Sequence, residues 1–178
     1  VPSDPRVLTP YSDASREKGS KTGSGFGAWA IIDNIFFYTE GRWDDAEVAR
    51  LDINTLELVA MNIGSFTFLR EAERRGRRID HLIEFTDNTA AEFAAERGKP
   101  KAARLGELVT RRYTALLAAG VYGATERVAS EDNDIADGLS RGADKLADAL
   151  RLAAATLLPI QRLEPHEEWR DTSHLMHF

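Results

Sequence analysis

Residues 25–39 read GFGAWAIIDNIFFYT, two apolar segments on either side of the pair Asp33-Asn34. Aromatic and β-branched residues such as Trp29 and Phe36 favour extended strands. Asp33-Asn34 is a turn signal, and two strands joined by so short a turn pair as an antiparallel hairpin. The stretch therefore predicts a hairpin near the start of the domain.

The segments on either side of this hairpin are expected to add a strand and a buried helix. Residues 7–15 end in YSDAS and predict a short strand. Proline is disfavoured within a central strand, so Pro10 implies that this strand starts at Tyr11 or is distorted. After a loop over residues 41–52, Asn54 or Thr55 is expected to cap a helix that extends to about Arg75 and is apolar nearly all round.

The rest of the chain alternates strands and helices. The expected elements are a strand over 81–85, a helix from Thr89 with a Thr89…Glu92 capping box and a break at 98–100, a helix over 102–119 stopped by Gly120, a strand over 121–129, an acidic turn over 130–134, a helix from about Ile135, a helix over 143–158 and a polar tail over 159–178. This order predicts a mixed α/β fold with helices covering a sheet. We expect one domain over 1–142, with 1–10 as an N-terminal arm, followed by a C-terminal helix and polar tail over 143–178.

The composition excludes several classes of protein. With no cysteine, neither disulfides nor thiolate zinc sites can form, which fits an intracellular setting. No apolar run approaches the roughly 20 residues of a membrane span, so no membrane partner is expected. The formal net charge of −6 argues against a generic nucleic-acid coat, because phosphate binding depends on Lys and Arg.

Four carboxylates stand out from their surroundings. Glu57 lies in the first turn of an apolar helix, where a charge is rarely buried without a partner or a metal; a favourable interaction with the helix dipole explains it equally well. Asp13 and Asp87 lie at strand ends, where turn and cap roles are common. Asp137 follows an acidic run that fails the calcium-loop register, because its sixth position, counted from Asp132, is not glycine. No single carboxylate decides the function.

Four segments taken together resemble the ribonuclease H domains of retroelement reverse transcriptases, of the gypsy or tyrosine-recombinase type. They are Tyr11–Ser15 (YSDAS), Asn54–Ala60 (NTLELVA), Thr86–Ala91 (TDNTAA) and Asp134–Arg141 (DIADGLSR). The resemblance covers roughly residues 8–141. It implies a ribonuclease H-like α/β fold with a five-stranded mixed sheet flanked by helices.

The resemblance also implies a site and a reaction. Asp13, Glu57, Asp87 and Asp137 would be the catalytic carboxylates and would bind two Mg²⁺ (or Mn²⁺) ions, which prefer hard oxygen ligands. The substrate would be the RNA strand of an RNA–DNA hybrid, and the reverse transcriptase domain of the same polyprotein would be a partner. Four residues are the substrate-binding candidates: Ser15, Asn88, Asn133 and Arg127. An arginine cluster could bind the DNA backbone or simply be a solvated helix end: Arg70, Arg74, Arg75, Arg77 and Arg78.

One departure from the family concerns catalytic strength. Many cellular members carry a mobile histidine ten residues before the last catalytic aspartate, and Arg127 occupies that position. A catalytically weak or inactive domain that serves as an RNA- or protein-binding platform is therefore the second hypothesis. A different nuclease or an integrase on the same fold is the third.

Overall fold

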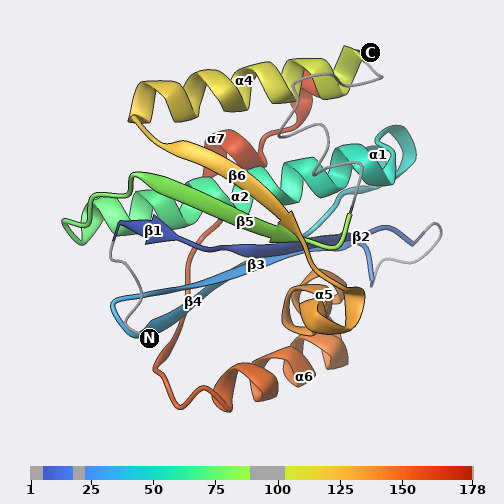
Figure 1. The fold of residues 1–178 in the computed structure, drawn as a ribbon. Helices are drawn as coiled ribbons and strands as arrows, with labels where there is room; N and C mark the ends of the chain where they lie inside the picture. The colour runs from blue at the N-terminus through green and yellow to red at the C-terminus, as the bar shows by residue number, and fades with distance from the viewer. Residues whose placement is uncertain (1–5, 18–22, 89–102, 178) are drawn as a thin grey trace.

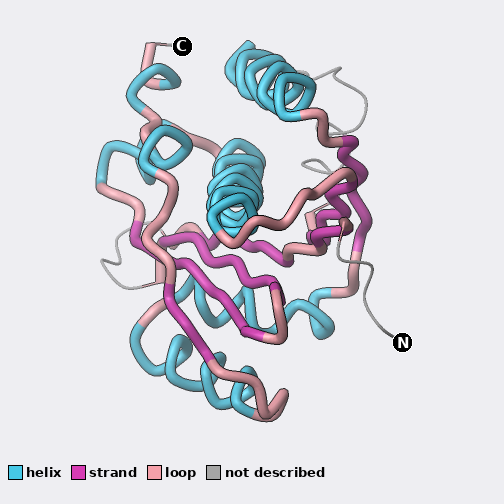
Figure 2. Tube along the Cα trace, turned by 90° about the vertical axis from the view of Figure 1, so that its left-hand side faces the viewer, coloured by secondary structure: helices cyan, strands magenta, loops and turns pink. Residues whose placement is uncertain are grey.

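The computed structural model describes residues 6–17, 23–88 and 103–177. One mixed sheet lies between two layers of helices (Figures 1 and 2). Its strands are β1 (Val7–Leu8), β2 (Tyr11–Ser15), β3 (Gly25–Ile32), β4 (Ile35–Arg42), β5 (His81–Thr86), β6 (Tyr122–Arg127) and β7 (Ile160–Arg162). The helices are α1 (Asp45–Arg50), α2 (Ile53–Arg74), α4 (Ala103–Ala119), α5 (Asp134–Arg141), α6 (Ala143–Ala154) and α7 (Glu167–Arg170), with 3₁₀ turns η1 (Ser130–Asn133) and η2 (Ser173–Leu175). The prediction of a mixed sheet flanked by helices is confirmed.

The hairpin forms where the sequence places it. β3 and β4 pair antiparallel from Gly25 opposite Arg42 to Ile32 opposite Ile35. The two turn residues, Asp33 and Asn34, have φ of 54° and 60°. Two consecutive positive φ values match the twist of the flanking strands, and Asp and Asn tolerate them better than most residues.

Pro10 interrupts the strand as expected. β1 and β2 both pair parallel with β5, and β2 begins at Tyr11. The carbonyl oxygen of Pro10 still accepts a hydrogen bond from the backbone amide of Phe85 at 2.9 Å. The ladder therefore continues past a residue that has no amide hydrogen to donate.

Helix α2 lies buried against one face of the sheet, as its apolar sequence predicts. Gly64 allows the close approach, because a Cβ there would lie 2.5 Å from the Cβ of Ala28 on β3. The predicted N-cap was wrong: Asp52 caps the helix, and its side chain accepts a hydrogen bond from the amide of Thr55 at 2.8 Å. The preceding segment, expected to be a loop, contains the short helix α1.

Helices α5 and α6 cover the other face of the sheet (Figure 1). Gly27 on β3 lies against α5, where a Cβ would come within 2.4 Å of the Cβ of Leu139. Consecutive residues of a strand point to opposite faces, so Gly27 faces α5 while Ala28 faces α2. α5 is thereby held directly over β2 and β3. The helices predicted over 102–119 and 143–158 and the strand over 121–129 are confirmed within a few residues.

Two predictions about the edge of the domain were wrong. The sheet has more than five strands, because β7 adds parallel to β4. Residues 159–178 were expected to be a polar tail, yet Trp169 is buried and stacks on Phe66 with ring centroids 4.0 Å apart. Arg170 also donates to the buried Glu47 of α1 at 2.7 and 2.9 Å. The segment therefore packs on the domain: Trp169 covers Phe66, and Arg170 neutralises the buried charge of Glu47.

The predicted helix from Thr89, its capping box and its break at 98–100 lie outside the described residues. Among the helices that the structure does describe, none is both long and apolar enough to cross a membrane.

Candidate metal centre

Asp13 and Glu57 meet at one backbone amide. Asp13 lies on β2 and is 4% exposed, and Glu57 lies near the start of α2 and is 6% exposed. The amide of Ala14 lies 2.9 Å from Asp13 Oδ1 and 3.1 Å from Glu57 Oε2, so it can donate to either carboxylate. The packing of α2 on β2 thus brings two buried acids together without an ion pair to either among the described residues.

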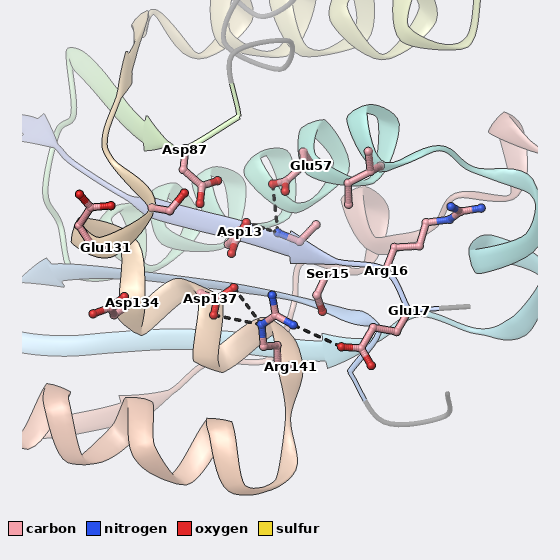
Figure 3. Close-up of a pocket in the computed structure, with 13 residues that line it drawn as sticks. Asp13, Ser15, Arg16, Glu17, Glu57, Asp87, Glu131, Asp134, Asp137 and Arg141 are labelled. Atoms are coloured by element: carbon pink, nitrogen blue, oxygen red, sulfur yellow. Dashed lines mark hydrogen bonds and ion pairs between the residues drawn. The ribbon is translucent and has the colours of Figure 1, made fainter. Parts of the chain in front are cut away.

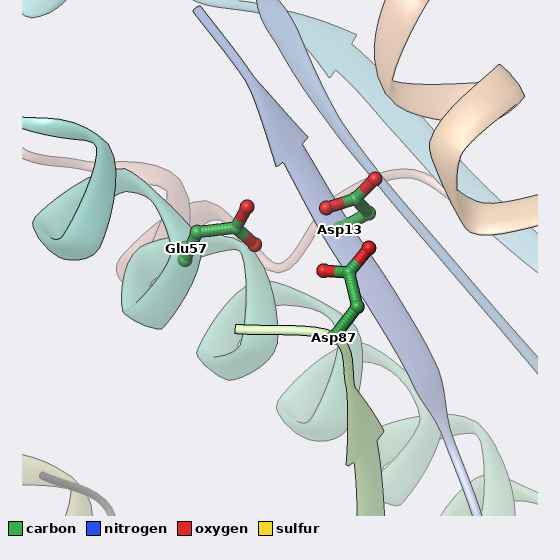
Figure 4. Close-up of side chains that lie close together, drawn as sticks. All are labelled: Asp13, Glu57 and Asp87. Carbon is green, nitrogen blue, oxygen red and sulfur yellow. The ribbon is translucent and has the colours of Figure 1, made fainter. Parts of the chain in front are cut away.

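Asp87 completes a group of three. It directly follows β5, the parallel neighbour of β2, so its side chain emerges beside Asp13 (Figure 4). One oxygen each from Asp13, Glu57 and Asp87 lies within 4.8 Å of the others. Carboxylate oxygens at this spacing suit a hard divalent cation such as Mg²⁺.

The proximity of these acids changes their protonation. Burial raises the pKa of Asp13 well above its ordinary value, and the charges of Glu57 and Asp87 raise it further. Burial also raises the pKa of Glu57, against the opposing effect of its hydrogen bonds with Asp13 and Ala14. The pKa of Asp87 is raised by burial and then by Asp137. Without a cation, this group holds protons that isolated carboxyls would release.

A pH dependence of stability follows. Carboxyls in the unfolded chain titrate near pH 4, whereas the raised pKa values keep protons on Asp13 and Glu57 in the folded protein to higher pH. The folded state then binds more protons than the unfolded state, so the free energy of unfolding falls as pH rises from about 4 through neutrality. Thermal unfolding in a chelator at pH 5 and pH 8 measures this fall in stability. We expect the fall to be smaller in Asp13→Asn, and we expect Mg²⁺ to restore stability to the wild type at pH 8. An equal or steeper fall in Asp13→Asn would contradict the assignment.

Asp137 lies on α5 and lines the same cavity, and its side chain makes a hydrogen bond with Asp13 that adds to the effects of burial, Glu57 and Asp87 on the pKa of Asp13. The cavity has a volume of about 520 Å³ and also includes Asp13, Glu57 and Asp87 in its wall (Figure 3). Among the described residues, the metal-compatible group does not include Asp137. Its two oxygens each accept from Arg141 Nε at 3.0 Å, one helical turn away. The structure therefore brings three of the four predicted carboxylates within metal-binding distance of one another and places the fourth beside Asp13, in an ion pair with Arg141.

Ser15 links β2 to α5. Its hydroxyl lies 2.5 Å from the carbonyl oxygen of Gly23 and 2.8 Å from that of Ser140. Arg42 donates to the carbonyl oxygens of Ser140 and Leu139 at 2.6 and 2.7 Å. These contacts satisfy carbonyls at the C-terminal end of α5, which lack helical partners. They fix the helix that carries Asp137 relative to the strand that carries Asp13.

The other substrate-binding candidates lie outside the cavity wall. Asn133 is buried, and its side-chain amide donates to the carbonyl oxygen of Ser12 at 3.0 Å. This hydrogen bond links η1 to β2. Asn88 donates to the side chain of Asn54 at 3.3 Å. Arg127 is exposed at the end of β6 and is aligned with Thr86. Their roles in substrate binding stay predictions.

The arginine cluster on α2 and the following turn is a set of ion pairs. Each member faces a carboxylate, in the pairs Arg70–Glu167, Arg74–Glu71, Arg75–Asp33, Arg77–Asp33 and Arg78–Asp80. This pairing offsets much of the positive charge on which a DNA-backbone contact would depend.

Sequence reasoning missed several residues of the cavity. Ser130, Glu131 and Asp134 line it from η1 and the start of α5, and a hydrogen bond from Ser130 opposes the rise in the pKa of Asp87. Their acidic run was interpreted only as a turn. Arg141 was also missed, although its spacing of four residues from Asp137 on a predicted helix is the signal for an ion pair.

No protein-family model matches the chain, and no curated protein matches its sequence. Solved structures do. RNase H1 from the halophilic archaeon Halobacterium salinarum aligns with a TM-score of 0.51 and 17% identity, over 75% of this chain and 93% of that one. The N-terminal RNase H domain of a Mycobacterium tuberculosis protein gives 0.54 and 18%, over 83% and 98%. LC11-RNase H1, isolated from compost and solved in complex with an RNA/DNA hybrid, gives 0.56 and 13%, over 74% and 92%. The chain therefore has a ribonuclease H-like fold.

Proposed function

We propose that this domain is a metal-dependent ribonuclease H that hydrolyses the RNA strand of RNA–DNA hybrids. The observation that carries the proposal is the group formed by Asp13, Glu57 and Asp87, with three carboxylate oxygens within 4.8 Å of one another in the wall of an open cavity. The likeness in fold to RNase H1 structures, one of them bound to a hybrid, supports the substrate class.

The donor set fits divalent metal ions. Asp13, Glu57 and Asp87 would hold Mg²⁺ or Mn²⁺, and Asp137 would contribute one oxygen while the other keeps its hydrogen bond from Arg141. Two buried, ionised acids at such short range repel each other unless a proton or a cation lies between them. The raised pKa of Asp13 shows that its ionised form is unfavourable without a cation. Bound ions of this kind lower the pKa of a coordinated water and offset charge on the phosphate being cut.

The protein's own groups would orient the reaction. The amide of Ala14, which reaches both carboxylates, fixes the direction in which Asp13 and Glu57 present their oxygens. The links from Ser15 and Arg42 to α5 set the position of Asp137. Such preorganisation matters because phosphodiester hydrolysis is accelerated by groups that are held in place, before the reaction, next to the charge that forms in the transition state.

We further propose that the domain belongs to a retroelement polyprotein, next to a reverse transcriptase domain. The support is the motif Asp134–Arg141, whose DGLSR ending resembles that branch of the family. Copurification of a longer product of the same reading frame with polymerase activity would test this.

The activity is tested by incubation with three labelled substrates in Mg²⁺ or Mn²⁺. We expect cleavage of the RNA strand of a hybrid, little cleavage of duplex DNA or single-stranded RNA, and none in a chelator. Hybrid binding without cleavage, together with no uptake of Mn²⁺ in calorimetry, would instead favour the binding platform. Preferential cutting of duplex DNA would favour a different nuclease.

A further inference from the structure

The cavity wall is strongly acidic. Seven of its thirteen residues are carboxylates and two are arginines, Arg16 and Arg141. A nucleic-acid strand carries one negative charge per phosphate, so it must find positive groups beyond any metal to enter such a cavity. The two arginines are therefore the candidates among the lining residues.

The two arginines differ in what they face. Arg16 donates through Nε to the carbonyl oxygen of Val48 at 2.9 Å, and Figure 3 shows its guanidinium directed away from Asp13 and Glu57. Arg141 lies between Asp137 and Glu17, with Nη1 3.3 Å from Glu17 Oε1. Arg141 Nη2 has no hydrogen-bond partner among the described residues, and the side chain is 38% exposed. Arg141 thus keeps a free donor at the cavity.

The position of Arg141 is set in advance. Asp137 contacts its Nε with both oxygens, and the spacing of four residues places the two side chains on one face of α5. Ser15 and Arg42 hold the end of the same helix. A guanidinium already ordered in this way loses little further side-chain entropy when it binds an anion.

We propose that Arg141 binds the substrate by donating from Nη2 to a non-bridging phosphate oxygen of the nucleic-acid strand that occupies the cavity. This deepens the proposed function and rests on it. Asp137 and Glu17 orient the guanidinium but leave that donor free. Figure 3 shows Glu131 and Asp134 at one end of the cavity, with Asp137 between them and Arg141.

The test compares Arg141→Met and Arg141→Lys with a matched control, Arg151→Met. Arg151 is an exposed arginine of α6 that pairs with Asp148 on its own helix, so its loss changes the net charge equally. For Arg141→Met we expect kcat/KM on the hybrid to fall about tenfold, mainly through KM, because one charge-assisted hydrogen bond is lost. The slope of log(kcat/KM) against log salt should weaken by about one.

The companion variants sharpen the result. Arg141→Lys should restore the salt slope but only part of the affinity, since lysine keeps the charge and loses the planar fork. Arg151→Met should match the wild type. Calorimetry should show that Arg141→Met binds Mn²⁺ at least as tightly as the wild type, because Asp137 is released from its ion pair.

Two results would overturn the inference while leaving the proposed function intact. One is an unchanged KM and salt slope in Arg141→Met. The other is a fall in kcat together with weakened Mn²⁺ binding in both Arg141 variants, which would mean that Arg141 acts only by holding Asp137. A wild-type protein that cuts no hybrid at all would overturn the proposed function, and the inference with it.

Discussion

Asp13→Asn is expected to reduce hydrolysis of the hybrid by about a thousandfold or more, equivalent to about 4 kcal/mol of barrier. Asparagine keeps the shape of the side chain but removes a negative charge and one carboxylate oxygen from the group with Glu57 and Asp87. The metal-free variant should be at least as stable as the wild type at pH 8, because a buried acid with a raised pKa has been removed. Steady-state cleavage and thermal unfolding on the same preparation separate lost chemistry from lost folding.

The matched control for this change is Asp148→Asn, the same chemical substitution at an exposed site on α6. It should leave the cleavage rate within about twofold of the wild type, since exposed pairs of this kind contribute little to stability. Wild-type rates in Asp13→Asn would remove Asp13 from the centre.

Arg112→Met is expected to cause the largest loss of stability, about 3–5 kcal/mol. Arg112 on α4 and Glu84 on β5 are both almost fully buried and pair through both guanidinium ends. Asn62 accepts from Arg112 at 2.9 Å, and Ser65 donates to Glu84 at 2.5 Å. Loss of the arginine leaves Glu84 as a buried charge with one hydroxyl for a partner, which is why the cost exceeds that of an exposed pair.

Urea unfolding of Arg112→Met, Arg151→Met and the double variant Glu84→Leu/Arg112→Met measures this effect. The double variant should recover most of the loss, because replacing both partners removes the unpaired charge. Hybrid cleavage by folded Arg112→Met should be little changed, since neither Arg112 nor Glu84 lines the metal cavity. A loss no larger than that of Arg151→Met would contradict the assignment of a buried ion pair.

Local signals in the sequence were sufficient for the hairpin and for α2. Asp33-Asn34 between two aromatic-rich segments left few other conformations, and the apolar character of α2 required burial on several sides. The N-cap was missed because Asp52, Asn54 and Thr55 are all good caps, and the structure uses Asp52. Local propensity cannot rank equivalent caps.

The buried ion pairs and β7 were beyond local reasoning. β7 is three exposed residues that pair only because β4 offers an edge, and such a segment has no alternation long enough to detect. Glu84 looks like any charged residue in a strand until Arg112, 28 residues later, lies opposite it. The carboxylate group of the site was proposed from family motifs, whereas the ion pair between Asp137 and Arg141 was not considered.

The most direct test of the metal centre is diffraction from a crystal soaked in Mn²⁺, with anomalous maps that locate the ions. We predict Mn²⁺ in the cavity, with oxygens of Asp13, Glu57 and Asp87 as ligands and with one Asp137 oxygen turned towards the ions while the other keeps its hydrogen bond from Arg141. An anomalous map without Mn²⁺ between these carboxylates, at an Mn²⁺ concentration that supports hybrid cleavage in solution, would contradict the proposed centre.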